Sequence, residues 1–340
     1  MTAPDTVRHA PQEGAPSTRE SPADVLRRNV ATASMVAVTL AVTVFFGVTT
    51  DAFFTLNNIL NVLRQLAPLL VVSVAMTYVI TTGQIDLSVG SVLAFVSASS
   101  AVLLRAGYDS SIVVVVALAA GAVIGAVNGW FSAYQGIPSF IVTLAALSYV
   151  RGVALLLTGG FSIPIDPALF FLTVGRGQLL GVSVPGILSI GAALLGAVVL
   201  SRMRFGQYVT GIGANEESVR RAGVPTRRIK LAVMVISGMS AALAGMMIAG
   251  RLGSGSANAG VAFELTVIAA VVLGGTDLFG GRGTILGTVV GAFLITILAN
   301  GLVLLGVSPF LTPIITGLIL LGAVWVNQRV FSRSSGRKRR

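Results

Sequence analysis

The chain has 340 residues, of which 54% are hydrophobic and only 10% are charged, and its mean hydropathy is +0.91. Soluble domains carry roughly a quarter charged residues, so this composition excludes a soluble enzyme and indicates an integral membrane protein. The 40 glycines and the low aromatic content favour closely packed membrane helices over a transmembrane barrel. The net charge of +11 does not indicate nucleic-acid binding, because the arginines lie in the tails and short loops where the positive-inside bias places them.

Several kinds of chemistry are missing from the sequence. Cysteine is absent, and the only histidine is His9 in the N-terminal tail, so we expect no catalytic, metal-binding or cofactor-binding residues in the core. No Gly-Lys-Ser/Thr triplet is present, and a phosphate-binding loop for ATP requires one. If ATP drives this protein, ATP-Mg must therefore be bound by another polypeptide.

In chain order, residues 1–28 are rich in Pro, Ser, Thr and charge and are predicted to form a disordered cytoplasmic tail. Arg27 and Arg28 mark the cytoplasmic edge of a membrane domain over 29–330, and residues 331–340 form a basic cytoplasmic tail. The fold class is thus an all-α integral membrane protein with about ten transmembrane helices and both termini cytoplasmic. The expected spans are 30–50, 59–82, 87–104, the two parts of 110–150 around Gly136-Ile137-Pro138, 184–200, 231–248, 263–278 and the two parts of 283–328.

The longest polar stretch between the first and last spans is the loop 202–230, and it has the pattern of one short helix. Asn215 is a good N-cap, two glutamates follow it in the first turn, two arginines occupy the last turn, and Gly223 suits a left-handed C-cap. The arginines indicate a cytoplasmic loop, which is either a topology signal or a docking helix; the caps favour docking. The residues expected to couple this chain to a partner are Gly206, Asn215, Glu216, Glu217, Arg220, Arg221 and Gly223.

Asp86 lies between two closely joined spans, where an acid exposed to lipid would be costly, so it must face protein or water. It either belongs to a translocation path or gate, or caps the third span as an acid before a helix often does. Neutral polar residues in the neighbouring spans suit a hydroxylated solute, but they also bond helices together. The candidate path residues are Gln84, Asp86, Ser88, Asn128, Ser139 and Thr143. Arg151 lies deep in the fifth span and is expected to extend to the surface or to pair with an acid.

Five stretches of the chain carry a combined pattern. They are GQIDLSVGS (83–91), GIPSFIVTLA (136–145), GANEESVRRAGV (213–224), ELTVIAAVVLGGTDLFGGRGTILGT (264–288) and Asn300-Gly301. Together they resemble the permease subunit of ribose-type ABC sugar importers, a family related to branched-chain amino-acid permeases. They occur in the family's order and cover nearly everything from the second span to the tenth. Thr82-Gly83-Gln84 departs from the family's usual Gly-Gly pair before Ile-Asp.

The resemblance implies import of a monosaccharide by alternating access in the bacterial inner membrane. It also implies a permease homodimer or permease pair, two cytoplasmic ATPase subunits and an extracytoplasmic sugar-binding protein, with the capped helix as the coupling helix. The alternatives are an ion-driven secondary transporter, which would need titratable groups inside the bundle, and a membrane enzyme, which the missing histidine and cysteine disfavour.

Overall fold

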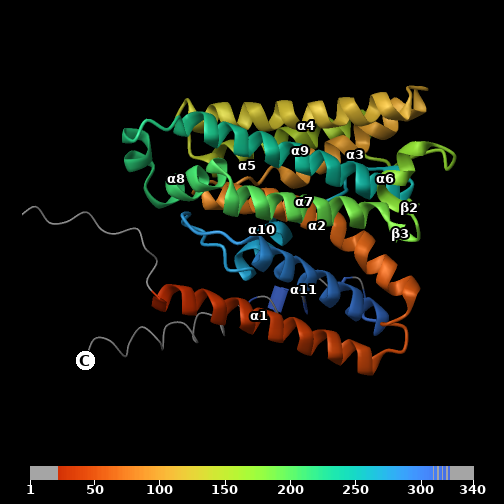
Figure 1. The fold of residues 1–340 in the computed structure, drawn as a ribbon. Coiled ribbons are helices and arrows are strands. Elements are labelled where there is room, and N and C mark those ends of the chain that lie inside the picture. The colour runs from red at the N-terminus through yellow and green to blue at the C-terminus, as the bar shows by residue number, and fades with distance from the viewer. Residues whose placement is uncertain (1–21, 309, 312–313, 316, 319–320, 322–340) are drawn as a thin grey trace, which may run out of the picture.

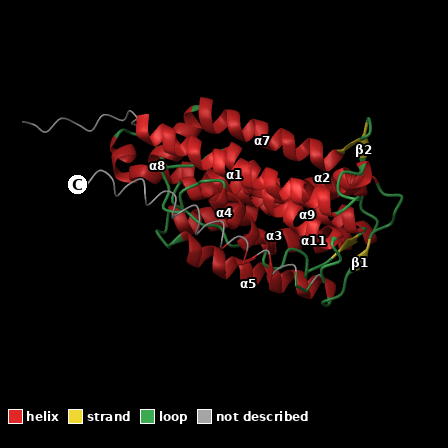
Figure 2. Ribbon diagram, turned by 90° about the horizontal axis from the view of Figure 1, so that it is seen from below, coloured by secondary structure: helices red, strands yellow, loops and turns green. Residues whose placement is uncertain are grey.

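The computed structural model describes residues 22–308, 310–311, 314–315, 317–318 and 321. The N-terminal tail over 1–21, the basic tail over 331–340 and most of the tenth expected span lie outside the described residues. Within them the chain forms a helical bundle, with α8 at one end and the short strands at the other (Figure 1, Figure 2).

Ten long helices and a few short elements make up this bundle. The long helices are α1 (Pro22–Thr49), α2 (Leu56–Thr81), α3 (Val89–Arg105), α4 (Ser110–Ala133), α5 (Ser139–Thr158), α7 (Val184–Arg202), α8 (Arg204–Arg221), α9 (Thr226–Leu252), α10 (Phe263–Leu273) and α11 (Ile285–Leu304). The short elements are the 3-10 turn η1 (Phe170–Leu172), α6 (Thr173–Arg176), and the antiparallel pairs β1 (Ile163–Pro164) with β4 (Ser254–Gly255) and β2 (Gln178–Leu179) with β3 (Val182–Ser183).

The predicted all-α membrane class agrees with this architecture. Six of the described helices, α2, α4, α5, α7, α9 and α11, are long and apolar enough to cross a membrane. The expected break at 136–138 separates α4 from α5, and the connection between α5 and α7 contains η1 and α6.

Two predicted boundaries are wrong. α1 begins at Pro22, so residues 22–28 are helical and not part of a disordered tail. Proline is tolerated there because the first N–H groups of a helix have no partner within the helix. The eighth span was expected over 263–278, but α10 ends at Leu273 after 11 residues. At 1.5 Å per residue, α10 is about 16 Å long, roughly half the thickness of a bilayer's hydrocarbon core.

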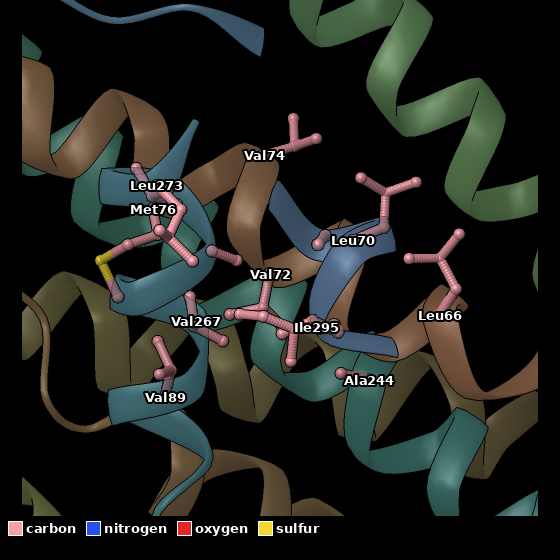
Figure 3. Packing of buried hydrophobic residues seen from close by; sticks show 14 of the residues in the cluster. Leu66, Leu70, Val72, Val74, Met76, Val89, Ala244, Val267, Leu273 and Ile295 are labelled. Atoms are coloured by element: carbon pink, nitrogen blue, oxygen red, sulfur yellow. The ribbon is translucent and has the colours of Figure 1, made fainter. Parts of the chain in front are cut away.

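The core of the bundle forms around α2. Every residue of α2 from Leu66 to Thr81 is buried, and its side chains meet those of α3, α9, α10 and α11 (Figure 3). A reciprocal pair of amide hydrogen bonds, each 3.0 Å, also ties Asn58 at the start of α2 to Asn300 of α11. By contrast, α4, α5 and α7 lie at the edges and expose apolar side chains such as Val115, Leu156 and Leu194, as expected of surfaces that face lipid.

Glycines on one face of α4 bring that helix against α9. A Cβ atom at Gly121 would lie 2.4 Å from the carbonyl oxygen of Gly238, and one at Gly125 would lie 2.4 Å from that of Met234. The two backbones therefore approach closely enough for direct contact, which is how small residues stabilise helix pairs in membranes.

Candidate functional site

The chain leaves helical geometry between α2 and α3, and the polar side chains of this segment are buried inside the bundle. We call residues 83–88 the buried break. Gln84 is 3% exposed, and Asp86 and Ser88 are each 1% exposed. Irregular backbone inside a membrane bundle is tolerated only where other parts of the protein satisfy its polar groups, so the contacts of the buried break define the site.

Asp86 accepts three hydrogen bonds and links the buried break to α9. One carboxylate oxygen, Oδ1, accepts from the backbone N–H of Ser88 at 2.9 Å and from the Ser88 hydroxyl at 2.6 Å. The other, Oδ2, accepts from the Ser237 hydroxyl of α9 at 2.6 Å. Ser88, not Asp86, occupies the N-cap position of α3. Asp86 therefore does not cap that helix; it closes a local turn and fixes this turn to a neighbouring span.

The other predicted path residues surround the same segment. The Asn128 amide of α4 donates to the Ser88 hydroxyl at 3.0 Å, and the Ser139 hydroxyl accepts the N–H of Ile85 at 3.0 Å. The Thr143 hydroxyl lies 3.2 Å from the carbonyl oxygen of Ile85.

Gln84 completes this set, since its amide donates to Ser132 of α4 at 3.2 Å. All six predicted residues thus lie together, as hydrogen-bonded partners of the buried break and of one another. Whether they form a translocation path stays a prediction.

Two participants were missed by the sequence reasoning. Ser237 and Ser132 are buried hydroxyls that bond Asp86 and Gln84. The sequence feature that could have identified them is only that each is a small polar residue within an apolar span. Ser237 lies 151 residues beyond Asp86 in the chain, so no local pattern connects the two.

Arg151 lies close enough to Glu264 for electrostatic attraction, in line with the expected pairing with an acid, and it also bonds the backbone. Its guanidinium donates to the carbonyl oxygens of Ala257 and Ala259 at 2.8 Å each, and to that of Gly260 at 3.3 Å. These carbonyls belong to the irregular segment that precedes α10. Arg151 therefore supplies the donors that this stretch of backbone lacks.

The predicted capped helix is confirmed within α8. The α8 segment contains a break at Asn215, whose φ and ψ are −163° and 94°, and the Asn215 side chain accepts the N–H of Ser218 at 2.9 Å. Gly223 has φ +83°, the left-handed conformation predicted for the C-cap. We call residues 216–221, between these two caps, the docking helix, after the role that is proposed for it below. Gly206, by contrast, is buried against the backbone of Leu200 at the α7–α8 turn, away from the docking helix.

The charged residues of the docking helix have two different roles: one attaches the helix to α9, and the others are exposed at the surface. Glu216 forms an ion pair of 3.0 Å with Lys230 of α9, whose side chain is 19% exposed. Glu217 pairs with both Arg220 and Arg221 within the helix. The two arginines are 62% and 79% exposed, and exposed pairs contribute at most about 1 kcal/mol to stability. Their charge is therefore available at the surface and matters little for folding.

We expect Ser237→Ala to destabilise the protein by about 1–3 kcal/mol, because a buried carboxylate oxygen of Asp86 loses its donor. The midpoint of thermal unfolding in detergent measures this loss. Ser148→Ala is the matched control, since the exposed Ser148 hydroxyl bonds only the carbonyl of Leu144 in its own helix. Equal midpoints for the two variants would contradict the role of Ser237.

The comparisons with known proteins agree on one family. A family model described as "Branched-chain amino acid transport system / permease component" matches residues 58–324. "Ribose import permease protein RbsC" of Escherichia coli K12 is 40% identical over 281 residues, covering 82% of this chain and 87% of that protein. "Probable ABC transporter permease protein YphD" of the same strain is 37% identical over 294 residues, covering 86% and 88%.

A third relative is "Xylose transport system permease protein XylH" of Escherichia coli K12, 33% identical over 362 aligned positions, which cover 88% of this chain and 92% of that protein. No solved structure matches the chain. The similarity runs through the buried break and the docking helix, which both lie within the matched residues. Together with the six long apolar helices, it identifies a multi-pass protein of the bacterial inner membrane. The chain belongs to the ABC transporter permease family that includes the ribose and xylose permeases.

Proposed function

We propose that this chain is the translocation subunit of an ABC importer for a monosaccharide, either ribose-like or a related small polar solute. Alternating access of the bundle would be powered by separate ATPase subunits, so the chain itself is not an enzyme. The observation that carries the proposal is the docking helix, a doubly capped segment with two exposed arginines at one end of the bundle.

The partners follow from what the chain contains and lacks. It has no phosphate-binding loop for ATP, so ATP-Mg would be bound by an ATPase subunit that contacts the docking helix. An extracytoplasmic sugar-binding protein would deliver the solute at the opposite end, where β1 pairs with β4. Two copies of the permease would form one pore in the lipid bilayer.

The substrate class is supported by the relatives and by the chemistry of the interior. The relatives are named for ribose and xylose, which are both neutral polyols. The side chains around the buried break mostly carry hydroxyl and amide groups. Groups of this kind can both donate hydrogen bonds to sugar hydroxyls and accept them. We infer that these groups become accessible to solute when the bundle changes conformation.

One observation favours a second candidate, an ion-driven transporter. Asp86 is a buried carboxylate with no ion pair among the described residues, and such acids can carry protons or sodium. Reconstitution separates the two functions. With the ATPase and binding protein present, uphill uptake should require ATP, and uptake driven by an ion gradient alone would overturn the ABC proposal.

We predict that both termini and the docking helix are cytoplasmic. Cysteines introduced at Ser17, Ser218 and Ser334 should react with an impermeant maleimide only after the membrane is opened, whereas Asn258→Cys should react in intact cells. The absence of native cysteine gives a clean background. Labelling of Ser218→Cys from outside would contradict this topology.

Reversing both docking arginines, Arg220→Glu with Arg221→Glu, should abolish coupling. The change puts acids in the last turn of the helix, against its dipole, and inverts the charge offered to the partner. We expect normal insertion, weaker co-purification with the ATPase, and uptake reduced by more than about tenfold, equivalent to about 1.4 kcal/mol.

The matched control is Arg202→Glu with Arg204→Glu, which makes the same charge change on exposed residues at the α7–α8 turn. That variant should retain uptake. If the Arg220/Arg221 reversal left both uptake and ATPase association intact, the docking role would be wrong and the loop would be only a topology signal.

A further inference from the structure

Three segments that are far apart in the sequence meet beside the docking helix through backbone contacts. They are the end of α2 and its C-cap (81–83), the last residues of α8 before its break (213–214), and the turn before α11 (280–283). The N–H of Gly281 donates to the carbonyl oxygen of Thr81 at 2.9 Å. We call these three segments the glycine junction.

Glycine is required at these contacts by space and by conformation. A Cβ atom at Gly213 would lie 1.9 Å from the oxygen of Thr81 and 2.3 Å from the nitrogen of Gly281. Gly213 therefore packs directly over the hydrogen bond that joins the other two segments. Gly280 has φ +90°, and a Cβ there would lie 2.9 Å from the nitrogen of Gly83. Side chains at these positions would push the segments apart.

The glycine junction is continuous in the chain with both functional regions. On one side, Ala214 is followed by Asn215, which starts the docking helix. On the other, Gly83 begins the buried break that contains Asp86, and only Thr284 separates Gly283 from α11. Two turns of the same type flank it, because Asp86 accepts the N–H of Ser88 and Asp277 accepts the N–H of Phe279, each at 2.9 Å.

We infer that the glycine junction transmits movement of the docking helix to the buried break and to α11, as one rigid unit. Contact between backbones contains no rotatable side chain that could absorb a displacement, and closely packed segments shift as units. The inference rests on the proposed function, since it gives the route by which an ATPase would act on the membrane bundle. Gly213, Gly280 and Gly281 are then positioning residues for transport.

The first test is Gly213→Ala in the reconstituted complex with ATPase and binding protein. We expect ATPase co-purification to be unchanged, sugar uptake to fall at least about tenfold, and ATP hydrolysis to lose its dependence on loaded binding protein. Gly191→Ala is the control, because a Cβ at that helical glycine of α7 meets no atom within 4 Å. Normal uptake and normal stimulation in Gly213→Ala would overturn the inference.

The second test decides the matter even if Gly213→Ala does not fold. The double variant Thr77→Cys with Thr288→Cys leaves every glycine of the junction in place. Its sulfur atoms replace two hydroxyl oxygens of α2 and α11 that lie 2.8 Å apart beside Gly283, close enough for a disulfide after a small adjustment. Since the chain has no other cysteine, oxidation should link only this pair. A rigid junction predicts that the oxidised complex transports as well as the reduced one.

Loss of transport on oxidation, restored by reductant, would mean that the segments separate during the cycle and would overturn the inference. The failure of the proposed function has a different signature. In that case the wild-type complex itself would show no ATP-dependent uptake, whatever the state of the junction variants.

Discussion

The fold depends on one constraint, which is that backbone polar groups inside an apolar bundle must find partners within the protein. The constraint is sharpest where a helix is interrupted. In the buried break, the Ile85 N–H bonds Ser139 and the Ser88 N–H bonds Asp86. Before α10, Arg151 donates to three carbonyl oxygens of one irregular segment. The first role of the polar residues in these spans is therefore to satisfy the hydrogen-bonding groups of irregular backbone. Any role in transport is a second one.

The same constraint links structure to mechanism. The polar groups of an irregular segment need hydrogen-bond partners from several helices. Side chains of α4, α5 and α9 therefore all bond the buried break. A displacement of that segment must change several of these bonds together, which favours discrete states over gradual deformation. The glycine junction attaches this segment to the docking helix. On the inference drawn above, a small movement of the docking helix would rearrange the polar side chains around the buried break.

Local signals allowed much of this to be predicted, and long-range contacts account for the rest. The lengths of the hydrophobic segments predicted most of the helices, and the caps at Asn215 and Gly223 predicted the docking helix. Each of these features is determined by residues close together in the chain. The early end of α10 was not predicted from its apolar sequence, and the bond between Arg151 and Gly260 joins residues 109 positions apart. The Asp86–Ser237 pair spans 151 residues. Gly206 was grouped with the docking residues by sequence position, yet its packing against Leu200 belongs to a turn.

The central claim is that motion of the docking helix reaches the buried break. It is tested most directly by the reactivity of a cysteine at Ser132, the partner of Gln84, toward a membrane-permeant maleimide in the complex with its ATPase. We predict that ATP and loaded binding protein change the labelling rate of Ser132→Cys, and that the change disappears when Gly213→Ala is added. The same nucleotide-dependent change with and without Gly213→Ala, or no change in either, would contradict the claim.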